Sequence, residues 1–208
     1  MSIGILGNKI GMTQIFTSKG EIIPVTIIKG GPCFVTQIKS TENCGYNAVQ
    51  IGYLELTKDS KKLTKPQLGH FTKVDLPPFR YLKEYKTETL NYNLGEKFSV
   101  EMFKIGELVS ITGFTIGKGF TGNVKRHNFK RGAMTHGSKH HRAQGSLGSG
   151  TTPGRVFPGK RMSGHSGMEK RTVSGLEIID IDINENIIII KGCIPGKSGN
   201  LVSITSKN

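Results

Sequence analysis

Short runs of apolar and β-branched residues recur toward both ends of the chain, separated by Gly, Pro and Asn. Alternating or continuous runs of this length are typical of β-strands. Turn signals between the runs include Ser18-Lys19-Gly20, Gly30-Gly31-Pro32 and Pro195-Gly196. The strands we expect cover residues 3–6, 13–16, 21–28, 34–38, 48–53, 108–112, 172–183, 187–191 and 201–205.

The two groups of strands predict one globular β-domain made from residues 1–113 and 172–208. Strand edges are protected when a sheet closes on itself, so the simplest architecture is a closed β-barrel built from both flanks. Thr64-Lys65-Pro66-Gln67 reads as a capping box with Pro in the first turn, which predicts a short helix near residues 65–74. The predicted fold class is mainly β.

The segment between the flanks, residues 114–171, has neither a helical nor an alternating apolar pattern and is rich in Gly. Residues 117–171 contain twelve Lys and Arg against one carboxylate, Glu169, and residues 108–168 contain no Asp or Glu. Such a segment cannot bury enough apolar surface to fold by itself. We therefore expect a long, basic, irregular loop insertion that becomes ordered on a partner.

Composition identifies the kind of partner. The 208 residues carry a formal net charge of +14, which favours a polyanion. Six of the seven Arg lie in the basic segment, and guanidinium groups suit bidentate recognition of phosphate and base edges. The longest uninterrupted apolar run has four residues, so no membrane partner is expected. Three cysteines without a C-x-x-C pair argue against a disulfide framework and a Cys-based zinc site.

The basic segment is interpreted as an RNA-penetrating arm whose cations neutralise phosphates while its aromatic side chains contact sugars or bases. The alternative is a disordered basic loop surrounded by counterions. The expected RNA contacts are the basic and histidine side chains Lys118, Lys125, Arg126, His127, Lys130, Arg131, Lys139, His140, His141, Arg142, Arg155, Lys160, Arg161, Lys170 and Arg171.

Two other motifs suggest different chemistry. Gly117-Lys118-Gly119-Phe120-Thr121-Gly122 matches the G-x-G-x-x-G dinucleotide fingerprint, but no acidic residue follows within reach of a ribose. His136, His140 and His141 have the spacing of possible zinc ligands, but the segment offers them no Cys or carboxylate to complete a tetrahedral site before Glu169. No catalytic Ser/His/acid or Cys/His set can be assembled in the acid-free segment, so we expect no catalytic residues, no metal, no cofactor and no small-molecule substrate.

A cluster of Gly, Ser, Thr and Pro lies near the middle of the basic segment. Such a cluster is what the turn of a long hairpin arm would contain, although a plain flexible loop would look the same. The residues expected at this tip are Gln144, Gly145, Gly148, Ser149, Gly150, Thr151, Thr152, Pro153 and Gly154.

Several stretches together resemble the bacterial-type L3 family of large-subunit ribosomal proteins. They are GNKIGMTQIF, PVTIIKGGPCFVTQIK, TIGKGFTGNVKRHNFKRG, GSLGSGTTPGRVFPGKRMSGHSG and IIIIKGCIPGKSGNLV. The match runs in order along the chain, and the wording GTTPGRVFPGK is similar to cyanobacterial and plastid members.

The resemblance implies a translation-protein type β-barrel (SH3-like, elongation-factor-like) that binds large-subunit rRNA and acts early in assembly. It also implies that the tip of the loop lies near the peptidyl transferase centre and that L14- and L19-type proteins are neighbours. The expected function is that of a structural constituent of the large ribosomal subunit, without enzymatic activity, in a plastid or the bacterial cytoplasm. The competing hypotheses are a nucleotide-dependent enzyme that uses residues 117–122 and a free RNA chaperone.

Overall fold

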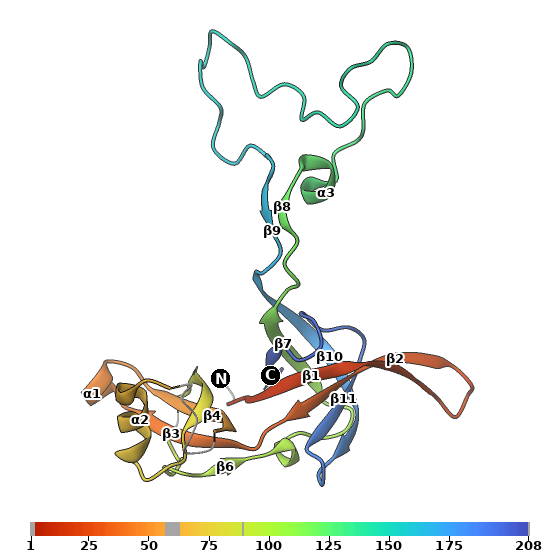
Figure 1. Cartoon of the computed structure of the whole chain (residues 1–208). Coiled ribbons are helices and arrows are strands. Elements are labelled where there is room, and N and C mark those ends of the chain that lie inside the picture. Colours follow the sequence, from red (N-terminus) through yellow and green to blue (C-terminus); the bar gives the residue numbers. More distant parts are fainter. Residues whose placement is uncertain (1–2, 57–62, 89, 208) are drawn as a thin grey trace. The chain divides into compact units, whose positions relative to one another are not determined.

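The computed structural model describes residues 3–56, 63–88 and 90–207 (Figure 1). The chain divides into two compact units, one made of residues 1–114 with 170–208 and the other of residues 115–169. The strands of the first unit form a closed ring and a separate four-stranded sheet, and the second unit contains a two-stranded sheet. The predicted class, mainly β with a short helix, is confirmed.

Six strands of the first unit form a closed ring in which every neighbouring pair is antiparallel. Alternation determines which side chains face the core, as Ile188 and Ile190 are fully buried while Ile187 and Ile189 are partly exposed. In ring order, the strands are β1 (Ile5–Phe16), β12 (Leu201–Ser206), β7 (Leu108–Phe114), β10 (Lys170–Asp182), β11 (Ile187–Lys191) and β2 (Ile22–Gly30).

Strand β1 joins two segments that the sequence pattern separates, residues 3–6 and 13–16. The residues between them, several of them polar or Gly, show no strand pattern in the sequence. They nevertheless pair with β2, with a register shift between Lys9 and Gly11. Lys9 is buried because its Nζ donates hydrogen bonds to the carbonyls of Ile194 (3.2 Å) and Gly196 (3.0 Å). Backbone pairing and these two bonds therefore stabilise the strand where its residues are polar.

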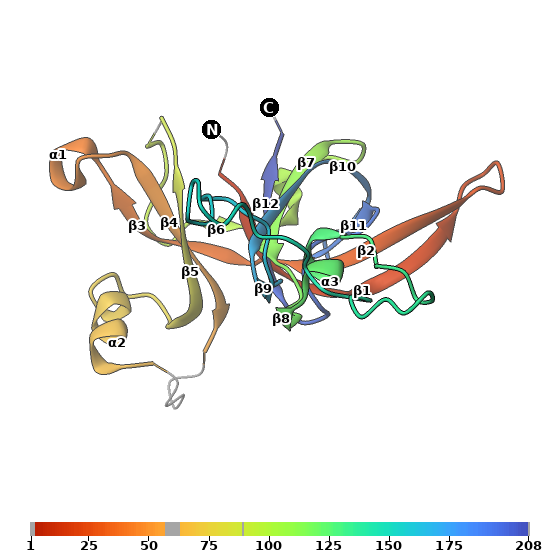
Figure 2. The same cartoon turned by 90° about the horizontal axis from the view of Figure 1, so that it is seen from above.

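The expectation that all flanking strands join one barrel is wrong for residues 34–38 and 48–53. These residues lie in a second antiparallel sheet, beside the ring strands in Figure 2. The reason is the tight connection after β2, where Gly31 adopts a φ of +69° and directs the chain into a new sheet. In sheet order, its strands are β5 (Phe79–Lys86), β4 (Ala48–Glu55), β3 (Cys33–Lys39) and β6 (Lys97–Phe98).

The ring and the second sheet share one hydrophobic core. Ile5 and Ile28 of the ring and Val35 and Ile51 of the sheet are fully buried in the same cluster. Each such side chain contributes roughly 1.5–3 kcal/mol relative to full exposure. The first unit is therefore held together by continuous apolar packing across both sheets.

The short helix predicted near residues 65–74 is confirmed as α2 (Lys65–Thr72). At its N-terminus, the backbone N–H of Thr64 donates to Gln67 Oε1 at 2.9 Å, as a capping box requires. Phe71 is the buried residue of the helix and packs edge-on against Phe79, with ring centroids 5.8 Å apart. Two shorter elements are α1 (Thr41–Cys44) and a single 3₁₀ turn (Val100–Met102). Within the described part of the chain, no helix is long and apolar enough to cross a membrane.

Candidate nucleic-acid interface

The two ends of the second unit run antiparallel to each other. Strand β8 (Gly119–Thr121) pairs with β9 (Gly164–Ser166), and the Lys118 N–H donates to the Ser166 carbonyl at 2.8 Å. Gly167 permits this close approach, because a Cβ built on it would lie 2.2 Å from the Ile116 carbonyl oxygen. The sequence pattern indicated no strands here, since three-residue strands rich in Gly have no detectable alternation.

One turn of helix, α3 (Asn123–His127), binds the returning chain at residues 161–162. Arg126 Nη1 donates to the Met162 carbonyl at 2.7 Å, and His127 Nε2 lies 3.1 Å from the same oxygen. Asn123 is buried and its Nδ2 donates to the Arg161 carbonyl at 3.3 Å. These contacts stabilise the segment with side chains instead of a hydrophobic core.

Arg126 and His127 were expected to contact RNA, and the structure assigns both of them an internal role as well. Their ring and guanidinium nitrogens bind the chain's own Met162 carbonyl. Arg126 is nevertheless exposed, and a guanidinium has five N–H donors, so one internal bond leaves donors for a phosphate. Asn123, which the sequence analysis did not single out, is the most buried member of this cluster at 5% exposure.

A second internal contact closes a smaller loop within the basic segment. The Gly132 N–H donates to the His141 carbonyl at 3.0 Å, and His141 Nδ1 lies 2.9 Å from the Ala133 carbonyl. A Cβ on Gly132 would lie 2.2 Å from the His140 carbonyl oxygen. This loop requires Gly at residue 132, and only the positions of the backbone carbonyls reveal that requirement.

The remaining expected contacts lie at the surface. Exposed side chains of the second unit are Lys118, Lys125, Lys130, Arg131, Lys139, His140, His141, Arg142, Arg155, Lys160 and Arg161. Lys170 and Arg171 are also exposed but belong to strand β10 of the ring, opposite Phe114 and Gly113 of β7. The second unit has ten Lys and Arg and one carboxylate, Glu169, so most of its positive charge cannot be neutralised within the unit.

Large apolar side chains are exposed among these cations. Phe120 is 79% exposed, Met168 63% and Phe157 58%. The Arg155 guanidinium lies 5.4 Å from the centroid of the Phe157 ring, a stacked arrangement that can also hold a nucleobase or ribose. Exposure of aromatic rings to water is unfavourable, whereas aromatic rings beside cations can bind nucleic acid by stacking on bases and contacting phosphates.

The expected tip, residues 144–154, contains neither helix nor strand. Gln144 is partly buried and its Nε2 donates to the Arg161 carbonyl at 3.5 Å. The other tip residues named above are exposed, and Ser146 Oγ forms a local turn with the Gly148 carbonyl and N–H, both at 3.3 Å. Small exposed side chains let the backbone approach a binding partner closely.

The dinucleotide motif does not form a nucleotide site. Strand β8 lies inside the motif and, among the described residues, pairs with β9 alone and antiparallel, whereas a dinucleotide site requires a parallel β-α-β unit. A helix does begin directly after Gly122, contrary to our expectation, but it has only five residues. Among the described residues, no group of three His, Cys, Asp or Glu side chains gathers into a possible metal site, so His136, His140 and His141 do not form one.

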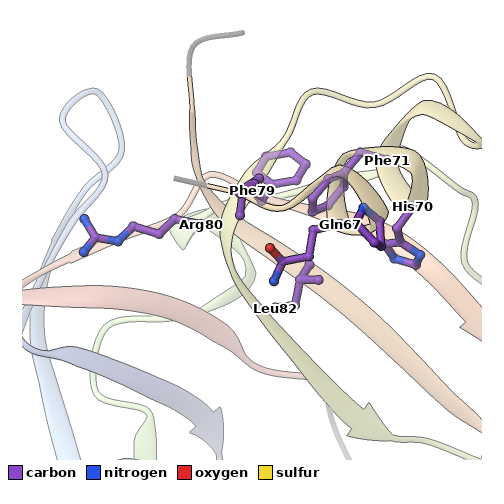
Figure 3. Close-up of a pocket in the computed structure, with 8 residues that line it drawn as sticks. Gln67, His70, Phe71, Phe79, Arg80 and Leu82 are labelled. Carbon is purple, nitrogen blue, oxygen red and sulfur yellow. The ribbon is translucent and has the colours of Figure 1, made fainter. Parts of the chain in front are cut away.

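An apolar pocket between α2 and β5 has a volume of about 400 Å³ (Figure 3). Gln67, His70 and Phe71 line it from the helix, while Phe79 and Leu82 line it from the strand, and the Arg80 guanidinium points away from the helix. His70 Nε2 lies 3.0 Å from Gln50 Oε1. The described lining residues include no carboxylate to pair with this histidine, so the pocket does not resemble a hydrolytic site.

Comparison with known proteins identifies the family. The family described as "Ribosomal protein L3" matches residues 88–185. A "Large ribosomal subunit protein uL3" from Picosynechococcus sp. is 56% identical over 210 residues, covering 100% of this chain and 98% of the relative.

Two plastid-type relatives are nearly as similar. The "Large ribosomal subunit protein uL3c" of Gracilaria tenuistipitata var. liui is 55% identical over 98% of this chain and 99% of its own length. The protein of the same name from Phaeodactylum tricornutum is 55% identical over 98% of both chains. The family resemblance found in the sequence is therefore confirmed, and the chain belongs to the L3 (uL3) family of large-subunit ribosomal proteins.

Proposed function

We propose that this structural, non-enzymatic constituent of the large ribosomal subunit binds large-subunit rRNA through its basic segment, residues 114–171. The observation that carries the proposal is the excess of exposed cations over carboxylates in the second unit, ten Lys and Arg against Glu169. Such an excess is unfavourable in the free chain because the like charges repel. Phosphates would relieve that repulsion and release counterions.

The tip, residues 144–154, which is exposed apart from Gln144, would brace RNA near the peptidyl transferase centre. Support comes from its small side chains, its exposure and the family to which the chain belongs. None of the tip residues is a strong acid, base or nucleophile, so peptide-bond chemistry would remain with the RNA. The chain's contribution would be mechanical, through contacts that fix the RNA backbone around the site.

The first unit would anchor the protein on the subunit during early assembly. Its closed six-stranded ring supports the translation-protein type of barrel, SH3-like, expected from the family. Neighbouring proteins of the L14 and L19 type would contact this unit. The cyanobacterial uL3 and plastid uL3c relatives place the ribosome concerned in the bacterial cytoplasm or a plastid.

Binding of the full chain to purified large-subunit rRNA, measured over a range of salt concentrations, tests the proposal. If about eight cations of the segment meet phosphates, log affinity falls against log salt with a slope of roughly −6 to −7. A slope near zero, or equal affinity for a neutral polymer, would contradict it. Remodelling of many unrelated RNAs without a stable complex would favour the free chaperone instead.

A further inference from the structure

A second basic feature lies on the first unit, outside residues 115–169. A pocket of about 260 Å³ is formed where Lys83 of β5 approaches Lys170 of β10, with Thr112 and Phe114 of β7 and Leu201 and Ser203 of β12 in its wall. Register explains why these side chains share one face. Phe114 pairs with Lys170 and Thr112 pairs with Ser203, and residues two apart on a strand face the same way.

Strand β5 is held against the ring beside this pocket through Tyr85. The Tyr85 hydroxyl lies 2.6 Å from Ser203 Oγ, which fixes β5 against β12. Lys83 is two residues earlier on the same face of β5, and its Nζ lies 5.0 Å from the Tyr85 ring centroid. The ammonium group is therefore held over an aromatic ring at the edge of the pocket.

The two lysines have no carboxylate in this pocket. The described lining residues are apolar or neutral apart from Lys83 and Lys170. Glu84 alternates to the other face of β5, where it pairs with Lys39 at 2.6 Å. Burial, together with the neighbouring Lys170 charge, lowers the pKa of Lys83 to about 8. Placing two cations together without a counterion is unfavourable unless an anion joins them.

We propose that Lys83 and Lys170 form a phosphate-binding pocket on the globular unit and that its occupant is a backbone phosphate of the bound RNA. The inference rests on the proposed function. Phe114 and Lys170 directly flank the second unit, residues 115–169, in sequence, so RNA held by that unit and RNA held by this pocket would contact consecutive parts of the chain. The exposed Phe114 ring, at 51%, offers an apolar wall for the adjoining ribose.

Lys83 is not recognisable from sequence, because it lies in an ordinary alternating stretch, RYLKEYK, with Lys and Glu on nearby positions. Its neighbour Lys86 provides a matched control. Lys86 is exposed on the opposite face of the same strand, with its Nζ 5.9 Å from the Tyr46 ring. A general electrostatic effect would involve both lysines equally, whereas the pocket involves only Lys83.

Acetylation of lysines in the wild-type full chain, read by mass spectrometry, tests the proposal without any substitution. Only the neutral amine reacts, and the lowered pKa makes Lys83 reactive in the free protein near pH 8. Large-subunit rRNA should protect Lys83 and Lys170 at least severalfold more than Lys86. Equal protection of Lys83 and Lys86, or none, would overturn the proposal. Protection by millimolar inorganic phosphate but not by rRNA would overturn the RNA phosphate as occupant.

Substitution provides a second readout, because each lost phosphate contact reduces the salt slope by roughly 0.7–0.9. Lys83→Met should weaken rRNA binding and reduce the slope by about 1, while Lys86→Met should leave both unchanged. If Lys83→Met binds with the wild-type slope while neutral substitutions in the basic segment weaken binding, the pocket is refuted and the proposed function stands. If the wild-type chain does not bind rRNA, the proposed function itself fails.

Discussion

The hydroxyl oxygens of Tyr85 and Ser203 lie 2.6 Å apart and join the four-stranded sheet to the closed ring. Both side chains are buried, at 7% and 5% exposure. Burial raises the pKa of Tyr85 well above its usual range, so the phenol keeps its proton and can donate. This bond is a polar contact between the two sheets, as is the bond that the Tyr53 hydroxyl donates to the Lys29 carbonyl at 3.3 Å.

Tyr85→Phe should therefore destabilise the first unit. The substitution leaves Ser203 Oγ buried without this partner, which costs about 1–3 kcal/mol of unfolding free energy. Urea denaturation measures the loss. A double substitution with Ser203→Ala should cost less than the sum of the two single changes, because it removes both partners. Fully additive effects would show that the two hydroxyls do not interact.

Stability should decrease in alkaline solution because of buried thiol and phenol groups. Burial raises the pKa of Cys33 from 9.0 to about 12 and that of Tyr53 from 10.0 to about 12. Above pH 9 the unfolded thiol loses its proton while the folded thiol keeps it, so the unfolded state binds fewer protons. The contribution is complete below pH 9 and is lost by about pH 12.

The expected loss from Cys33 is at most about 1.4 kcal/mol for each pH unit in this interval. Urea titrations at several pH values between 8 and about 11 measure it. Cys33→Ala should reduce the pH dependence, and Cys44→Ala, at an exposed position, should not. An identical pH dependence in all three proteins would contradict the assignment.

Replacing Arg155, Lys160 and Arg161 together by Ala should weaken rRNA binding without unfolding the ring. These side chains are exposed in the second unit, so their loss removes charge rather than packing. The salt slope should decrease by roughly 2–3, while the melting temperature of the first unit stays constant. A matched triple substitution of exposed lysines on the first unit, Lys19, Lys65 and Lys73, should have a smaller effect. Equal loss of melting temperature and RNA binding would contradict this account.

Substitution of Arg126 should speed hydrogen exchange of the β8–β9 pair, whereas substitution of Lys118 should not. Arg126→Lys keeps the charge but loses the guanidinium bond to the Met162 carbonyl, so amide hydrogens of β8 and β9 should exchange faster. Lys118→Ala removes an exposed charge, while the bond to Ser166 comes from the backbone N–H and remains. Hydrogen exchange of residues 119–121 and 164–166 compares the two variants. Faster exchange in Lys118→Ala alone would reverse the assigned roles.

Sequence alone predicts the parts of the fold that apolar periodicity encodes. The runs 187–191 and 201–205 are strands as predicted, and in the first of them the buried Ile188 and Ile190 alternate with the partly exposed Ile187 and Ile189. Phe79–Lys86 was missed because its alternating pattern includes charged residues on both faces, one of them Lys83. The division into a ring and a second sheet depends on the conformation at Gly31, which no hydrophobic pattern encodes.

Sequence likewise predicts some features of the candidate site and not others. Charge asymmetry identifies the basic segment directly, because the absence of acids over residues 108–168 is visible in the sequence. The internal roles of Arg126, His127 and Asn123 could not be predicted, since each binds a backbone carbonyl about 35 residues away. Lys83 could not be found either, because its pocket requires β5 to pack against β7, β10 and β12.

Sedimentation of a lysate through a sucrose cushion at roughly half-molar salt tests the central claim most directly. Exposed ion pairs alone are strongly weakened at that ionic strength. A chain whose basic segment is built into folded rRNA should pellet in one-to-one proportion with large subunits. A chain that remains in the supernatant would contradict the account, because it would then bind RNA only through transient surface charge.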